Sequence, residues 1–149
     1  MLFSIIILAL SPYASGSPLG TLEANIPALF EKESTAVTFT FHPLAPLGRD
    51  ILPRYTVIEI DADGKLIRHL GPIIDDGIYG DRKKNDGVLG RKFQLNYKGP
   101  GTRRFAVKDE REGQVISAPV TINIIRHPSF QELLSRIWGQ ISGRSRNGT

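Results

Sequence analysis

The segment Val37-Thr38-Phe39-Thr40-Phe41 alternates strictly between apolar and polar side chains. A period of two places successive side chains on opposite faces of an extended chain. The segment therefore predicts a β-strand with one face in a hydrophobic core, and His42-Pro43 marks its end. Similar short segments continue to residue 125 without a helical period, so the alternation decides the fold class.

Turn residues separate these extended segments. Asp63-Gly64 lies between Arg54–Ile60 and Lys65–Leu70, a pattern that predicts a β-hairpin because both turn residues tolerate positive φ. Val115–Ile125 is expected to be the last strand, with an edge or a bulge at Pro119. About seven strands between residues 21 and 125 predict an all-β, immunoglobulin-like antiparallel β-sandwich over residues 35–125. A small barrel is the alternative.

The chain changes period after the last predicted strand. Ser129 and Glu132 have the spacing of a capping box, which marks the start of a helix. An amphipathic helix is therefore predicted within residues 128–142, and residues 143–149 are predicted to form a disordered tail. The apolar side chains recur at helical spacing at Phe130, Leu133, Leu134, Ile137, Trp138 and Ile141.

The N-terminus has the layout of a secretory signal peptide over residues 1–16. Leu2–Leu10 is apolar apart from Ser4, and small residues precede a cleavage position after Gly16. No Lys or Arg precedes the apolar run, and a buried N-terminal strand is the alternative. Export would place the protein outside the cell, in the periplasm or at the cell surface, without stable membrane insertion after cleavage. Residues 17–34 form a lead-in segment in which Leu22–Ile26 could pair as an edge strand.

Composition excludes several classes of function. The 149 residues suit one domain, and the absence of cysteine excludes disulfides, thiolate metal sites and a cysteine nucleophile. The net charge is +4, but the basic C-terminal residues lack the interleaved aromatic side chains typical of nucleic-acid binding. We therefore expect no nucleic-acid partner.

The loop Asp75-Asp76-Gly77-Ile78-Tyr79-Gly80-Asp81-Arg82-Lys83-Lys84-Asn85-Asp86-Gly87 is rich in oxygen donors and glycine. It predicts either a calcium site or a network of structural turns. The structural alternative has Asp81 and Asp86 accepting backbone N–H groups, and Lys83-Lys84 would weaken a cation site. The candidate calcium ligands are Asp75, Asp76, Asp81, Asn85 and Asp86.

This loop resembles an element of bacterial exported proteins with the pattern D-D-G-x-x-G-D-x-x-x-[GN]-D-G-[IV]-[YL], which joins two strands of an immunoglobulin-like or fibronectin-like sandwich. The match runs from Asp75 to Leu89, and the wider resemblance covers residues 35–125. The resemblance implies an extracellular or periplasmic accessory domain that is not itself an enzyme. It implies no particular ligand.

The sequence contains no recognisable catalytic motif, and its three histidines fall in separate segments. We therefore expect a non-catalytic accessory or spacer domain of an exported bacterial protein. Its expected role is structural positioning or protein interaction, with neighbouring domains or envelope proteins as partners. No cofactor is expected unless the loop holds calcium. The alternative is a module that binds carbohydrate or calcium, and Tyr79 in the loop is a candidate exposed aromatic.

Overall fold

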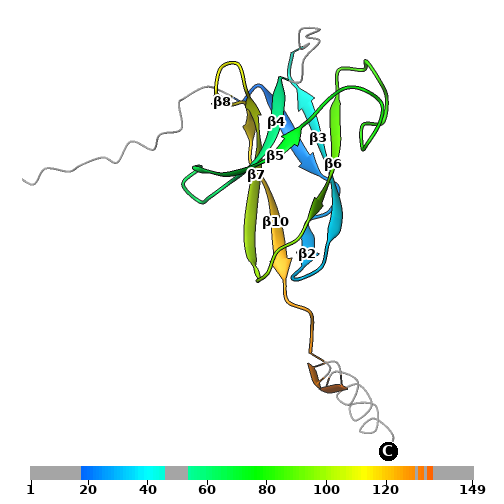
Figure 1. Ribbon diagram of the computed structural model, residues 1–149, viewed down its shortest axis with the longest axis vertical. Coiled ribbons are helices and arrows are strands. Elements are labelled where there is room, and N and C mark those ends of the chain that lie inside the picture. Colours follow the sequence, from blue (N-terminus) through cyan, green and yellow to red (C-terminus); the bar gives the residue numbers. More distant parts are fainter. Residues whose placement is uncertain (1–17, 46–53, 130, 133, 136–149) are drawn as a thin grey trace, which may run out of the picture.

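The computed structural model describes residues 18–45, 54–129, 131–132 and 134–135. In this part of the chain, ten β-strands form two sheets (Figure 1). Side chains from both sheets meet in one hydrophobic core, so the arrangement is a β-sandwich. The predicted all-β, two-sheet architecture is therefore confirmed.

The two sheets differ in size. The four-stranded sheet contains, in spatial order, β6 (Leu89–Leu95), β3 (Thr35–Pro43), β1 (Gly20–Ala24) and β9 (Ser117–Ala118). The six-stranded sheet contains, in spatial order, β2 (Ala28–Phe30), β10 (Val120–Ile125), β7 (Gly101–Asp109), β4 (Tyr55–Ile60) and β5 (Leu66–Pro72), with β8 (Gln114–Val115) paired to β7. Neighbouring strands are antiparallel, except that β9 runs parallel to β1 and β2 parallel to β10. The β4–β5 hairpin is the one that Asp63-Gly64 predicted.

The expected count of about seven strands is wrong, because both ends of the sandwich chain change sheets. Near the N-terminal end, the chain pairs as β1 in the four-stranded sheet and then as β2 in the six-stranded sheet. Val115–Ile125, expected to be one strand, is divided into β8, β9 and β10. Ile116 N–H donates to Val107 O at 2.8 Å while Ile116 O accepts from Leu19 N–H at 2.8 Å, so the chain joins the two sheets at this point. Pro119 has no N–H to continue a ladder.

The core forms where alternating side chains of the two sheets face one another. Val37, Phe39 and Phe41 on β3 are fully buried, as the alternation of that segment predicts. The Phe39 ring lies 5.0 Å, centroid to centroid, from Phe105 on β7, so it bridges the two sheets. A buried apolar side chain of this size stabilises the fold by about 1.5–3 kcal/mol.

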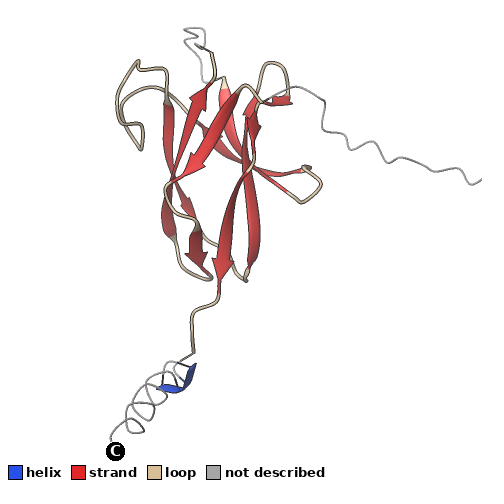
Figure 2. Cartoon of the chain, turned by 180° about the vertical axis from the view of Figure 1, so that it is seen from behind, coloured by secondary structure: helices blue, strands red, loops and turns tan. Residues whose placement is uncertain are grey.

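The chain leaves the sandwich after β10 and continues away from it (Figure 2). Gln131, Glu132, Leu134 and Ser135 have helical backbone. Ser129 N–H donates to Glu132 Oε2 at 2.7 Å and Glu132 N–H donates to Ser129 Oγ at 3.2 Å, the reciprocal bonds of a capping box.

These four helical residues do not support the predicted C-terminal helix as a whole, because its other positions lie outside the described residues. The predicted signal peptide (1–16) and disordered tail (143–149) also lie outside them. Within the described part of the chain, no helix has the length and apolar character needed to cross a membrane.

Gly90 at the start of β6 lets the loop of residues 73–88 approach the sheet closely. A Cβ at this position would lie 2.5 Å from Asp81 Cα and 2.8 Å from Gly80 O, both backbone atoms. Gly90→Ala should therefore lower the free energy of unfolding by about 1–3 kcal/mol. Chemical denaturation followed by circular dichroism measures the change.

Gly99→Ala is the matched control, because a Cβ there would meet no atom within 4 Å. We expect its stability to stay within about 0.5 kcal/mol of the unsubstituted protein. Equal stabilities for the two variants would contradict the close approach of the loop to β6.

Candidate functional site

The loop of residues 73–88 leaves β5 in the six-stranded sheet and returns as β6 in the four-stranded sheet. It folds back along β6, where bridges join Ile74 to Gly90 and Gly80 to Arg91. Lys92 N–H donates to Tyr79 O at 2.6 Å. The loop therefore covers part of an edge strand whose backbone groups would otherwise be open to pairing.

The loop is held in shape by its own aspartates. Asp75 accepts N–H groups from Asn85, from Asp86 at 3.3 Å and from Gly87 at 2.8 Å. Asp81 Oδ2 accepts from Gly77 N–H at 2.6 Å. Asp75 thus connects two parts of the loop that are ten residues apart in sequence, and Asp81 connects the loop's centre to the turn at Gly77.

Asp81 and Asp86 show the bonding that the structural alternative predicted. Asp81 Oδ1 lies 3.5 Å from Lys83 N–H, and Asp86 Oδ1 accepts from Val88 N–H at 3.0 Å. These are side-chain to backbone turns that Asp forms readily. The loop can therefore keep its conformation through bonds within the protein.

The structure brings together three of the four aspartates among the candidate calcium ligands. One carboxylate oxygen each from Asp75, Asp81 and Asp86 lies within 4.8 Å of the others. Asp76 instead accepts from Ile78 N–H at 3.0 Å, and its Oδ2 lies 3.8 Å from the Arg91 guanidinium. Asn85 has a φ of 61° and contributes its N–H to Asp75.

The three clustered carboxylates are suitable ligands for a calcium ion, because hard cations prefer oxygen ligands. Three carboxylates would leave further positions to backbone carbonyls and water. The calcium site stays a prediction.

Sequence analysis missed three buried carboxylates outside the loop: Glu31, and two that lie in the β4–β7 pair. Glu59 on β4 is 2% exposed and Asp109 on β7 is 1% exposed. In the β4–β7 pair, Glu59 lies opposite Phe105 and Tyr55 lies opposite Asp109. The two carboxylates therefore occupy opposite ends of the same pair of strands, at the margins of the core.

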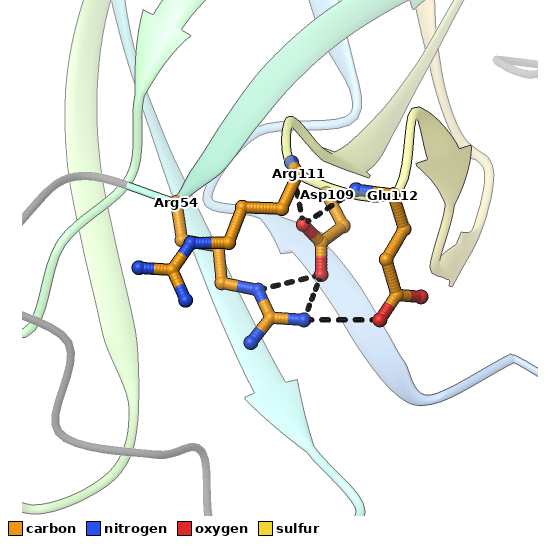
Figure 3. A network of polar contacts seen from close by, with 4 residues as sticks. All are labelled: Arg54, Asp109, Arg111 and Glu112. Carbon is orange, nitrogen blue, oxygen red and sulfur yellow. Dashed lines mark hydrogen bonds and ion pairs between the residues drawn. The ribbon is translucent and has the colours of Figure 1, made fainter.

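Asp109 is neutralised by Arg54, which directly precedes β4 (Figure 3). Arg54 Nε and a terminal nitrogen donate to Asp109 Oδ2 at 2.7 and 2.5 Å. The backbone N–H groups of Arg111 and Glu112 donate to Oδ1 at 2.9 and 3.4 Å, so Asp109 also holds the turn after β7. Burial opposes ionisation of Asp109, but these hydrogen bonds outweigh it and hold its pKa below the usual value.

Glu59 is held by side chains from three other segments. Its Oε2 accepts from Arg68 Nε on β5 at 2.8 Å and from the Tyr97 hydroxyl at 2.9 Å. Arg68 also donates to the Tyr97 hydroxyl at 2.9 Å, and Arg103 Nε on β7 lies 3.9 Å from Glu59 Oε1. Burial, together with the bond to Glu59, raises the pKa of Tyr97 to about 12.

A strand-parity signal could have found both carboxylates. Glu59 has the same parity as Tyr55 and Val57, and Asp109 the same parity as Phe105 and Val107. An acidic side chain in register with core residues predicts a buried charge that needs a cationic partner. The identity of that partner was not visible, because Arg54 and Arg68 meet these acids only through strand pairing. These two pairs connect strands in the interior, and nothing in their geometry assigns them a catalytic role.

Comparison with known proteins leaves the family open. No family model matches the sequence, and no curated protein matches it. Among solved structures, the adhesin InvE of Yersinia pseudotuberculosis is similar, with 18% identity and a TM-score of 0.43 over 73% of this chain. The chain spans 27% of that adhesin structure.

A CARDB domain from Pyrococcus furiosus is also similar, with 16% identity and a TM-score of 0.41 over 73% of this chain and 94% of that domain. At these identities and TM-scores, neither likeness carries an inference about ligand, partner or role.

The raised pKa of Tyr97 predicts a loss of stability in alkali. The folded-state pKa is about 12 against an ordinary value of 10.0. The stability that Tyr97 contributes through this difference is therefore complete below pH 10 and is lost as the pH rises towards 12. Tyr97→Phe should lack this alkaline component and should lose about 1 kcal/mol near pH 7 through the missing hydrogen bond. Urea denaturation at a series of pH values measures both effects.

Tyr79→Phe provides the control, since that hydroxyl lies on an exposed side chain. This variant should show the same loss of stability at alkaline pH as the unsubstituted protein. A decline of the same size in Tyr97→Phe would show that another group causes it.

Proposed function

We propose that this chain is a non-catalytic, immunoglobulin-like accessory or spacer domain of an exported bacterial protein. Its role is to position its neighbours, or to bind a partner protein, outside the cytoplasm. The proposed partners are neighbouring domains or envelope proteins. The proposed location is extracellular, periplasmic or at the cell surface, and it depends on the signal-peptide prediction for residues 1–16.

The strand order supports the immunoglobulin-like assignment. In such sandwiches, strands A, B and E share one sheet and strands C, F and G share the other, with C′ added beside C in the variable type. Here β1, β3 and β6 share one sheet, and β4, β7 and β10 share the other, with β5 beside β4. The loop of residues 73–88 takes the place of strand D between β5 and β6.

The observation that carries the spacer role is a contact where the chain leaves the sandwich. The His127 ring stacks on Phe30 of β2, with 4.2 Å between the ring centroids and 16° between their planes. His127 Nε2 lies 2.6 Å from Glu33 Oε1, and Arg126 Nε lies 3.6 Å from Glu31 Oε1.

These contacts hold Arg126 and His127 against β2 and the segment that follows it, so the chain leaves the sandwich in a defined direction. A spacer needs such a junction, because the direction of exit sets the position of whatever follows.

A distance measurement between two spin labels tests the junction. The sequence has no cysteine, so Ala62→Cys and Gln131→Cys place labels at two exposed positions only. Double electron–electron resonance should give one narrow distance distribution. His127→Ala should broaden it, because both the ring stacking and the contact with Glu33 are removed.

His42→Ala is the control, because His42 lies on β3 and faces Glu23 at 3.8 Å, away from the exit. It should leave the distribution narrow. A broad distribution in the labelled protein that keeps His127, or a narrow one after His127→Ala, would contradict the spacer role argued from this contact.

Calcium binding is the second candidate function, favoured by the clustering of Asp75, Asp81 and Asp86. If calcium binds, millimolar calcium should raise the melting temperature, because a ligand that binds only the folded state stabilises it. Asp75→Asn should abolish the increase, whereas Asp63→Asn, in the β4–β5 hairpin, should leave it intact. An unchanged melting temperature in the unsubstituted protein would remove calcium as a ligand.

A further inference from the structure

In the loop of residues 73–88, most acidic side chains are at least half-buried, whereas the basic side chains are exposed. Asp81 is buried and 8% exposed, while Asp75 and Asp76 are half-buried. Asp86 is exposed. The basic side chains of the loop and of the adjacent β6 face solvent at Arg82, Lys83, Lys84 and Lys92.

Hydrogen bonding strengthens this division. Asp75 and Asp81 direct their carboxylates to backbone N–H groups within the loop, and Asp76 faces Arg91. Arg82, Lys83 and Lys84 follow one another at the exposed turn. A stretch that is acidic in sequence therefore presents mostly positive charge to solvent.

The same loop carries an exposed aromatic ring. Tyr79 is 67% exposed and its neighbour Ile78 is 52% exposed. Tyr79 has a φ of 52°, and its carbonyl is fixed by Lys92 N–H at 2.6 Å. The Arg91 guanidinium lies 4.9 Å from the ring centroid. The backbone that carries the ring is thus already ordered, which lowers the entropy lost when a ligand binds.

We propose that this surface binds an anionic polysaccharide. The basic loop surface consists of Ile78, Tyr79, Arg82, Lys83, Lys84 and Lys92. Its cations would pair with the carboxylate or sulfate groups of the polymer, and the Tyr79 ring would stack against the apolar face of a sugar ring. The proposal concerns the β5–β6 loop and is independent of the spacer role, which depends on the junction at His127.

The composition of the surface favours a polysaccharide over the other polyanions. A bilayer would require more apolar area than Ile78 and Tyr79 provide. Proteins that bind single-stranded nucleic acid stack successive bases on several aromatic side chains, whereas this surface contains one ring. A single ring among cations suits a polymer in which charged sugars repeat.

Affinity electrophoresis of the full chain in gels containing alginate, a polymer of uronic acids, tests the proposal. Dextran, a neutral polysaccharide, is the reference polymer. Migration should be retarded by alginate and unaffected by dextran, and added salt should weaken the retardation because the contacts are ionic.

Two triple variants separate a local surface from general attraction. Arg82→Gln/Lys83→Gln/Lys84→Gln should weaken alginate binding about tenfold, since three exposed charge contacts are lost. Lys32→Gln/Lys65→Gln/Lys98→Gln removes the same charge from exposed positions elsewhere and should change binding less than about twofold. Tyr79→Asn keeps a residue that tolerates positive φ and should weaken binding about threefold or more.

Four results would overturn the proposal. The first is no binding to alginate, and the second is equal binding to dextran. The third is an equal loss in the two triple variants, which would show attraction by net charge alone. The fourth is tighter binding to phosphatidylglycerol vesicles or to single-stranded DNA than to alginate, which would assign the surface to another anionic partner.

Discussion

The pairing of β4 with β7 is the interaction on which the rest of the sandwich depends. This pair contributes Val57, Phe105 and Val107 to the core, and it carries a buried carboxylate at each end. A buried charge is costly unless it is paired and hydrogen-bonded. Asp109 therefore requires Arg54, and Glu59 requires Arg68 and Tyr97. These partners connect the pair to the turn after β7, to β5 and to the segment that follows β6.

This arrangement also bears on where a partner could bind. The buried carboxylates at both ends of the β4–β7 pair are already paired with cationic side chains. Chemistry that could serve a partner is found at the margins. One such place is the β5–β6 loop, and the other is the junction at which the chain leaves β10.

The β5–β6 loop shows that the charge of a sequence segment is not the charge of the surface it forms. Asp81 is needed to satisfy N–H groups inside the loop, which places its carboxylate inside as well. Lysine and arginine have long side chains whose charged ends remain in water. The loop therefore presents more positive charge to solvent than its sequence suggests.

The alternation of residues 37–41 was sufficient to predict a strand, its buried face and the all-β class, because period-two patterning is a local property of the chain. The β4–β5 hairpin and the turn role of Asp81 and Asp86 were predictable for the same reason. Sheet membership was not, so the division of Val115–Ile125 and the true strand count were missed. The partners of Glu59 and Asp109 and the clustering of Asp75, Asp81 and Asp86 also required the three-dimensional arrangement. These features depend on contacts between segments far apart in the chain, and only tertiary packing decides which of them meet.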